Sequence, residues 1–323
     1  MNERHVRVLH MVAETYIDTA HPVPSGRIAE RLEVSSATVR NDFGTLEEGG
    51  LLQQPHTSAG RIPTARGFHA YALSFLPPRR ATTSRVRALR ARLRTLEGDG
   101  LFDLASRAAA ELSGYAVLVK LPPDESLRIL EIHLTLLSSR RLLAVVVLEN
   151  GLIRQIGVDL DPAPSDATID DAERNLRQLT LPVGEVPAAL RSLAASTDED
   201  LSRTLTAVAD AWGGLQQPRR FTGGLGRLLT EPEAGDAGFV KLVVDRFESD
   251  RGDDLEWHGA YGIALTEHLA QVGTAFAFAG GTATLTLVGP TRMRYRDAVA
   301  IAQDVSEALS AVTSGELYSS HEA

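Results

Sequence analysis

The sequence of 323 residues contains no cysteine. This absence excludes disulfides, iron–sulfur clusters held by thiolates and zinc sites built on thiolates. Nine histidines are present, but they are scattered along the chain and form no metal-site motif. We therefore expect no metal ion and no cofactor, and nothing in the sequence indicates an oxidising compartment.

The sequence also lacks the patterns expected of a secretory leader and of a membrane span. Residues 1–10 carry charges and no apolar run, which predicts no signal peptide. Residues 269–291 hold no charged side chain and are numerous enough to cross a bilayer, but glycines and Pro290 interrupt them. Their apolar residues alternate with Thr and Gly, which predicts a β-hairpin instead. We expect a cytoplasmic protein that has no membrane partner.

The usual signatures of catalysis are absent as well. The sequence contains no His-Glu-x-x-His motif and no nucleophile elbow. Gly223-Gly224-Leu225-Gly226 lacks the Lys and the Ser or Thr of a phosphate loop. The acidic residues within 245–256 lack the spacing of a calcium loop and suit a solvated loop. We expect no catalytic residue and no enzyme.

Charge is distributed unevenly along the chain, although its net value is −9. Residues 1–100 hold 14 arginines against 10 acidic residues, whereas the remaining residues hold 19 basic against 32 acidic side chains. No Asp or Glu occurs between Gly49 and Leu96, a stretch that contains nine arginines. A basic N-terminal module on an acidic body favours a nucleic-acid partner for that module.

The N-terminal pattern predicts three helices, a short hairpin and a fourth helix, which is the order of a winged helix-turn-helix. Apolar positions at helical spacing predict the first helix over residues 4–19, and two prolines then end it. Ser25, Ser35 and Thr64 are natural N-caps for the three later helices. Strand-like residues 51–54 and 61–62 flank a turn-like segment, which predicts the hairpin.

The third predicted helix, which runs to about Glu48, has the two faces that a recognition helix needs. Val39, Phe43 and Leu46 share a face to be buried. The opposite face carries Ala37, Arg40, Asn41 and Gly44.

Arg pairs with guanine and Asn with adenine in the major groove. Ala37 suits a thymine methyl, and Gly44 permits close approach. Ser36 and Thr38 in the first turn suit a phosphate. A plain solvated surface is the alternative for this face.

The hairpin is expected to form the wing. His56, Thr57, Ser58, Gly60 and Arg61 lie at its tip and suit contact with the DNA backbone or the minor groove. Any polar loop has a similar composition. The segment therefore supports DNA binding only because it follows the predicted recognition helix. The arginine run at 79–94 either touches phosphates or forms a solvated linker helix.

The body is expected to be an α/β domain interrupted by an insertion, so the whole chain is of the α+β multidomain class. Strand-like runs occur at 115–121, 127–137, 142–148 and 152–160, a helical pattern follows at 170–179, and strands resume at 273–279 and 283–288 before a final helix at 295–312.

A dimer seam is a further expectation, because an operator with two-fold symmetry needs a two-fold protein. Leu201, Leu205, Val208 and Trp212 form a heptad-like stripe that suits such a seam. The same stripe also suits a helix packed on its own domain. Arg292, in the block 289–295, either braces the body or lines a small pocket.

Five segments together resemble the HrcA family of heat-inducible transcription repressors. They are Tyr16-Ile17-Asp18-Thr19, Ser35-Ser36-Ala37-Thr38-Val39-Arg40-Asn41-Asp42, Leu46-Glu47-Glu48-Gly49-Gly50-Leu51, Gln54-Pro55-His56-Thr57-Ser58-Ala59-Gly60-Arg61-Ile62-Pro63-Thr64 and Gly289-Pro290-Thr291-Arg292-Met293-Arg294-Tyr295. Their order spans nearly the whole chain. The chain departs from the family pattern at Ala20-His21, where a Gly is usual, and at Tyr261-Gly262-Ile263-Ala264, where an acidic segment is usual.

The resemblance implies a winged helix, a GAF-like domain and an inserted dimerisation domain. We place the winged helix at 1–76, an Arg-rich linker helix at 77–100, the GAF-like domain at 101–181 and 263–315, the insertion at 182–262 and a frayed tail at 316–323. The resemblance also implies a homodimer that represses chaperone operons through an inverted-repeat operator, CIRCE. It further implies that the GroEL chaperonin keeps this repressor active.

A small-molecule-responsive regulator with the GAF-like domain as sensor is the main alternative. A basic RNA- or chaperone-binding module is another, and it would show no preference for one inverted repeat.

Overall fold

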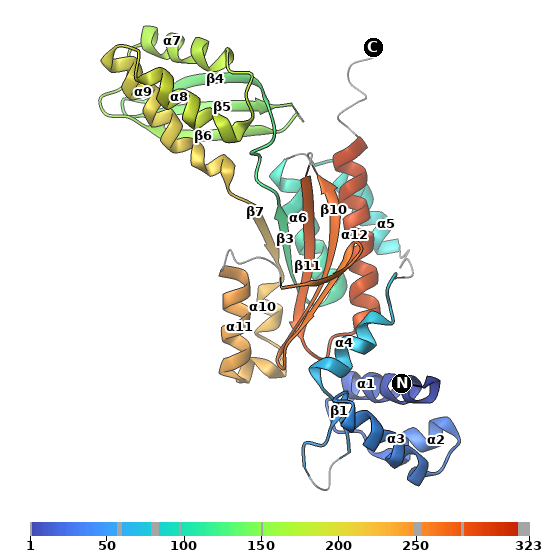
Figure 1. The fold of residues 1–323 in the computed structure, drawn as a ribbon. Coiled ribbons are helices and arrows are strands. Elements are labelled where there is room, and N and C mark those ends of the chain that lie inside the picture. The colour runs from blue at the N-terminus through green and yellow to red at the C-terminus, as the bar shows by residue number, and fades with distance from the viewer. Residues whose placement is uncertain are drawn as a thin grey trace.

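The structure is a computed structural model that describes residues 2–56, 60–78, 84–96, 98–149, 151–248, 254–278 and 281–315. Figure 1 shows three parts: a helical N-terminal unit at one end, a central sheet with helices, and a smaller sheet with helices at the other end. Of the residues expected to form the wing, Thr57 and Ser58 lie outside the described ranges, as does the tail at 316–323.

The N-terminal unit has the predicted winged helix-turn-helix order. Its elements are α1 (Glu3–Thr19), α2 (Ser25–Leu32), α3 (Ser36–Glu48), β1 (Leu52–Gln53), β2 (Ile62–Pro63) and α4 (Ala65–Leu73). Thr64 caps α4 through its side chain, as expected. The expectation that Ser25 caps α2 is wrong: Pro24 occupies the cap position, and the Ser25 hydroxyl instead lies 2.9 Å from the Ser36 hydroxyl.

The winged helix buries two separate faces. One face forms its own core from α1, α2 and α3 around Leu9, Ile28 and Phe43. The other face, on α1 and α4, joins the core of the body, where Phe68 and Tyr71 lie beside the fully buried Tyr295. The winged helix is therefore docked on the body through apolar packing as well as joined to it by the chain.

The central sheet has six strands in the order β7-β3-β11-β10-β9-β8, and every neighbouring pair is antiparallel. Its strands are β3 (Ala116–Leu121), β7 (Arg219–Gly223), β8 (Glu256–His258), β9 (Tyr261–Leu265), β10 (Leu269–Phe278) and β11 (Gly281–Pro290). Alternating residues give the sheet two buried faces. Helices α5 (Ser84–Leu93), α6 (Asp99–Ser113) and α12 (Tyr295–Gly315) cover one face, whereas α10 (Leu225–Leu228) and α11 (Ala237–Glu248) pack on the other.

The hairpin expected within 269–291 is confirmed, because β10 and β11 pair from Leu269↔Pro290 to Phe278↔Gly281. Strand burial explains the long uncharged run: both faces of this hairpin are covered by helices, so polar alternation is largely lost. No helix in the described part of the chain is long and apolar enough to cross a membrane.

Between β3 and β7 the chain leaves the central sheet and builds a separate unit. That unit contains β4 (Ile129–Ser138), β5 (Arg141–Leu148), β6 (Ile153–Asp159), α7 (Asp166–Arg177), α8 (Val186–Ala194) and α9 (Glu199–Ala211), with short 3-10 turns at Val183–Glu185 and Trp212–Gln216. It has its own core, centred on Trp212 and Ile132. A buried ion pair of Arg154 and Asp124, 2.7 Å apart, lies where the chain enters this unit.

The strand pairing therefore divides the body differently from the expected boundaries at 182 and 262. The strands at 129–159 form their own three-stranded sheet, in the order β4-β5-β6, and do not join β3. The segment after 219 returns to the central sheet as β7, β8 and β9. Period-two patterning identifies strands, but it does not reveal which distant strand each will pair with.

Candidate nucleic-acid interface

Helix α3 begins at a side-chain cap that the sequence predicts. The Oγ of Ser35 accepts a hydrogen bond from the backbone N–H of Thr38 at 3.1 Å, and the two hydroxyl oxygens lie 2.8 Å apart. Such a cap satisfies one of the free N–H groups of the first helical turn. The start of the helix is thereby fixed.

One face of α3 is buried as expected, since Val39, Phe43 and Leu46 are at most 3% exposed. Asp42 shares this face and is 1% exposed, which the sequence analysis missed. Its Oδ1 accepts hydrogen bonds from Arg4 at 2.7 and 3.1 Å, and His5 lies 3.3 Å away. The carboxylate thus ties α3 to the start of α1. A helical wheel places Asp42 between the apolar positions, and that was the available signal.

The opposite face of α3 is open to solvent. Ala37, Arg40 and Asn41 are exposed, and Gly44 is half-buried. Among the described residues, neither the Arg40 guanidinium nor the Asn41 amide has a hydrogen-bond or ion-pair partner. A Cβ added at Gly44 would meet nothing within 4 Å. Two residues of this face, Ala37 and Gly44, are small and leave room for a close approach. The other two, Arg40 and Asn41, are of the types that read guanine and adenine.

A groove of about 370 Å³ lies between the start of α2, α3 and the base of the wing. Arg40 and Phe43 line it from α3, and Gln54, Gly60 and Arg61 line it from the wing. Ser36 turns its hydroxyl toward Ser25 on the same side, whereas Thr38 turns its own toward Ser35. Of the two hydroxyls expected at a phosphate, both thus have an intramolecular partner in this structure.

The wing differs from expectation at two of its described residues. Arg61 was expected at the tip, but it lies at the base, where its Nη2 and Nε contact Oε2 of Glu47 at 2.9 and 3.1 Å. Its backbone also pairs with Val23. A Cβ at Gly60 would come within 2.2 Å of the Val23 carbonyl oxygen, so this glycine permits a close backbone approach. His56 is exposed, as expected for a contact residue.

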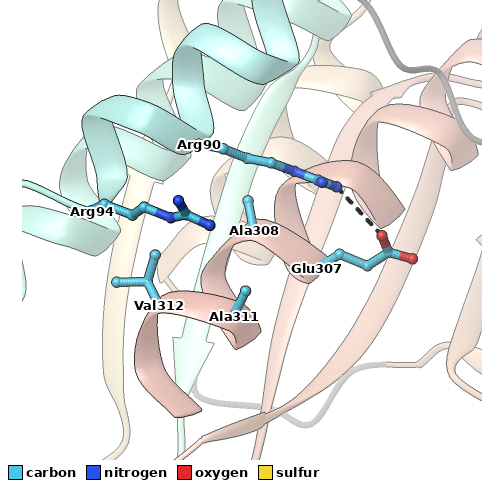
Figure 2. Close-up of a pocket in the computed structure, with 6 residues that line it drawn as sticks. All are labelled: Arg90, Arg94, Glu307, Ala308, Ala311 and Val312. Carbon is cyan, nitrogen blue, oxygen red and sulfur yellow. Dashed lines mark hydrogen bonds and ion pairs between the residues drawn. The ribbon is translucent and has the colours of Figure 1, made fainter. Parts of the chain in front are cut away.

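The described part of the arginine run lies on the body. Leu89 and Leu93 bury themselves in the core beneath α5. Figure 2 shows Arg90 directed toward Glu307 of α12, 3.4 Å away, with Arg94 beside Val312 across a pocket of about 200 Å³. In Figure 1, α5 runs beside α12 and away from α3. Arg90 thus helps to hold α5 on α12, whereas Arg87 and Arg92 of the same helix are exposed to solvent.

The four side chains expected at a dimer seam are buried inside their own chain. Leu201 is 8% exposed, whereas Leu205, Val208 and Trp212 are fully buried, and the Trp212 Nε1 donates to the Val183 carbonyl at 3.1 Å. Because these side chains already fill the core of the separate unit, they cannot also form a face toward a second chain. That expectation is wrong, and the alternative of a helix packed on its own domain is the one observed.

Arg292 is the centre of an ionic brace. It contacts Glu233 at 2.6 and 3.0 Å and Glu231 at 2.8 Å, and these hydrogen bonds, first of all those to Glu233, raise the pKa of its guanidinium. Nearby, the hydroxyl of the half-buried Tyr115 accepts a hydrogen bond from the Arg294 backbone N–H, and desolvation raises the pKa of Tyr115. Arg292 therefore braces the body, which was one of the two predictions for this residue. It also fulfils the other, because it lines a cavity of about 570 Å³ between the winged helix and the body.

These features define a class: a winged helix-turn-helix transcription regulator whose DNA-reading unit is docked on a larger body. Residues 15–64 match the family model of the DeoR-like helix-turn-helix domain. Residues 99–255 match that of the HrcA protein C terminal domain. A relative from Moorella thermoacetica, named heat-inducible transcription repressor HrcA, is 30% identical over 96% of this chain and 97% of its own length. The chain belongs to the HrcA family.

Other comparisons agree with this assignment. A relative of the same name from Shouchella clausii is 28% identical over 96% of this chain and 97% of its own length. A crystal structure of a protein described only as hypothetical superposes with a TM-score of 0.61 at 23% identity, covering 97% of this chain and 99% of the other. The second likeness bears on the fold alone, and it extends over all three parts of the molecule.

Proposed function

We propose that this chain represses transcription of a heat-shock chaperone operon by binding operator DNA through α3. The observation that carries the proposal is the exposed face of α3, where Arg40 and Asn41 have no partner among the described residues while the opposite face is buried. The relatives named heat-inducible transcription repressors support the regulated process. Regulation of this kind needs no catalytic group, and we expect no enzymatic activity.

Within this function each contact residue has a distinct part. Arg40 and Asn41 read bases in the major groove, with Ala37 against a thymine methyl and Gly44 allowing close approach. Ser36 and Thr38 contact phosphate after releasing their intramolecular partners. His56, Thr57 and Ser58 contact the backbone from the wing. Arg61 positions the wing through Glu47 rather than reaching out from its tip, and Gly60 lets the wing approach Val23.

The operator is an inverted repeat of the CIRCE type, and the active repressor is a homodimer. A two-fold operator presents two half-sites a whole number of helical turns apart, which a second copy of the chain must occupy. Leu130, Leu137 and Ile153 are candidate contacts for that second copy, since these large apolar side chains are 63%, 57% and 59% exposed on β4 and β6. Large exposed apolar side chains that gather on one unit mark an association surface.

The GroEL chaperonin keeps the repressor in its active form in this proposal. Run-off transcription from a template with an inverted repeat at the promoter tests repression and chaperonin dependence together. We expect the purified chain to lower transcript yield, and the chaperonin to restore this effect after mild heating. Equal yield with and without the repressor, whether or not the chaperonin is present, would rule the proposal out.

The central sheet domain is GAF-like in this proposal, and that leaves a second candidate function. Such a domain could sense a small molecule, and the cavity of about 570 Å³ beside Arg66 and Arg292 lies where a ligand would touch both the winged helix and the body. A metabolite screen by thermal shift separates the two functions. Stabilisation by a small molecule that also alters operator affinity would favour the sensor.

A further inference from the structure

Two histidines far apart in sequence meet at one carboxylate. The Nε2 atom of His69 lies 3.3 Å from Oε2 of Glu256, and the Nε2 atom of His258 lies 3.5 Å from Oε1 of the same residue. One candidate ligand atom from each of the three side chains lies within 4.8 Å of the other two. The histidines looked scattered in the sequence because this meeting joins α4 to β8, elements separated by most of the chain.

The local backbone explains why these three side chains converge. Glu256 and His258 are alternate residues of β8, so both project from one face of the strand. A two-residue turn with Gly259 at φ +67° joins β8 to β9 and holds the hairpin. His69 faces this hairpin from α4, whose neighbouring Phe68 and Tyr71 are buried in the body core. The helix that carries His69 and the hairpin that carries Glu256 and His258 are thus both held in place by their surroundings.

We propose that His69, Glu256 and His258 bind a divalent transition-metal ion such as Zn²⁺. Two imidazoles and one carboxylate suit zinc, nickel or copper, whereas magnesium and calcium prefer oxygen ligands. Zinc bound at about 2.0–2.2 Å in tetrahedral geometry separates its ligand atoms by roughly 3.3 to 3.5 Å. Each imidazole nitrogen already lies this far from one oxygen of Glu256, but the two contacts use different oxygens, so side-chain rotation is needed to bring all three ligand atoms around one ion.

The remaining coordination position would be open to water. Glu256 and His258 have side chains that are 64% and 37% exposed, so an ion can enter from solvent without opening the fold. His69 is the more enclosed ligand, with 24% of its side chain exposed. Simple surface ion pairs of the carboxylate with the two histidines are the rival interpretation, and such pairs contribute little to stability.

A bound ion would clamp the winged helix to the body. His69 belongs to the DNA-reading unit, whereas Glu256 and His258 belong to the edge of the central sheet. The ion would add a coordination link beside the apolar docking of Phe68 and Tyr71, and so restrict how α3 is presented. Any effect on operator affinity rests on the proposed function, but ion binding itself does not.

Calorimetric titration of zinc into the untagged, full-length protein tests the site without DNA. We expect one ion per chain in the wild type, and an affinity lower by roughly tenfold or more in both His258→Gln and Glu256→Gln. His133→Gln is the matched control, because His133 also lies near two carboxylates, Glu131 at 3.7 Å and Glu173 at 3.6 Å, but has no second imidazole. Undiminished affinity in the two site variants, or no saturable binding, overturns the proposal.

Trp257 provides a second readout that locates the ion. It lies between the two β8 ligands and packs over Gly262, where a Cβ would come within 3.1 Å of its ring. The other tryptophan, Trp212, is buried in the separate unit. We expect Ni²⁺ to quench the emission of the wild type saturably, and to leave Trp257→Phe unquenched although calorimetry still detects binding. Equal quenching in both proteins would place the ion elsewhere and contradict the proposal.

Discussion

In the proposed function, Arg40 is the side chain on which recognition of the operator bases most depends. It is exposed on α3, lines the groove beside the wing and has no ion-pair partner among the described residues. A bidentate arginine–guanine contact discriminates against other bases by about 1–3 kcal/mol. We expect Arg40→Ala to weaken operator binding by that amount and to relax preference at one base pair of each half-site.

Binding curves on operators with single base changes would measure both effects. Arg107→Ala is a suitable control, because Arg107 is an exposed arginine of α6 on the body, with 72% of its side chain accessible. Unchanged operator affinity in Arg40→Ala would show that α3 does not enter the groove as assigned.

His10 should make the stability of the winged helix depend on pH. Its ring lies edge-on to Tyr71, with centroids 5.1 Å apart, and desolvation lowers its pKa below the ordinary value of 6.5. The unfolded chain therefore takes up a proton at a higher pH than the folded one. Stability is fully present above about pH 6.5 and falls as pH drops below it, until the folded state also protonates.

Urea unfolding at a series of pH values between about 7.5 and 5 checks this expectation. The informative quantity is the difference in the free energy of unfolding between the wild type and His10→Gln at each pH. We expect the wild type to lose more stability than the variant across this range. Parallel pH profiles for the two proteins would mean that protonation of the half-buried His10 ring is not linked to folding.

At the scale of elements, α3 is held firmly in position although its own helical stability is reduced. The Ser35 cap and the contacts of Asp42 with Arg4 and His5 hold it in position. The weakness comes from Gly44, because a glycine inside a helix costs about 0.5–1 kcal/mol relative to alanine. The loss of helix stability at Gly44 is explained if this position must let α3 approach DNA closely.

Gly44→Ala should therefore change stability and binding in opposite directions. The variant gains up to about 1 kcal/mol in the free energy of unfolding, because a Cβ there meets nothing within 4 Å. Its operator affinity falls, because the added methyl stands between α3 and the bases. Urea unfolding and DNA titration measure the two quantities. Gly100→Ala, an equally open glycine of α6, should leave DNA affinity unchanged, and a Gly44→Ala variant that binds as tightly as the wild type would remove Gly44 from the interface.

The local elements could be predicted from the sequence because their signals are local. The cap at Ser35, the apolar face of α3 and the hairpin of β10 and β11 each follow from residues within a few positions of one another. The predictions that failed depend on contacts with other elements, which the local pattern does not show. Arg61 pairs with Glu47, and the stripe at Leu201 packs into the core of its own unit.

At the scale of the whole molecule, the proposed function needs a dimer, because one recognition helix contacts only one half-site of an inverted repeat. We expect Leu130→Glu combined with Ile153→Glu to give a monomer by sedimentation velocity, because each change replaces an apolar side chain that is 63% or 59% exposed with a charged one. Affinity for the full operator should then approach that for a half-site. Leu229→Glu, which alters a leucine exposed by 58% on another unit, is the control. A double variant that stays dimeric would place the seam elsewhere.

The most direct test of sequence-specific repression is fluorescence anisotropy of the full-length protein on a labelled inverted repeat, compared with a scrambled duplex, across a salt series and with the chaperonin present. We predict that the inverted repeat binds at least about a thousandfold more tightly than the scrambled duplex. Both affinities should fall as salt rises, because phosphate contacts release counterions. Equal affinity for the two duplexes would contradict the central claim and indicate a non-specific nucleic-acid binder.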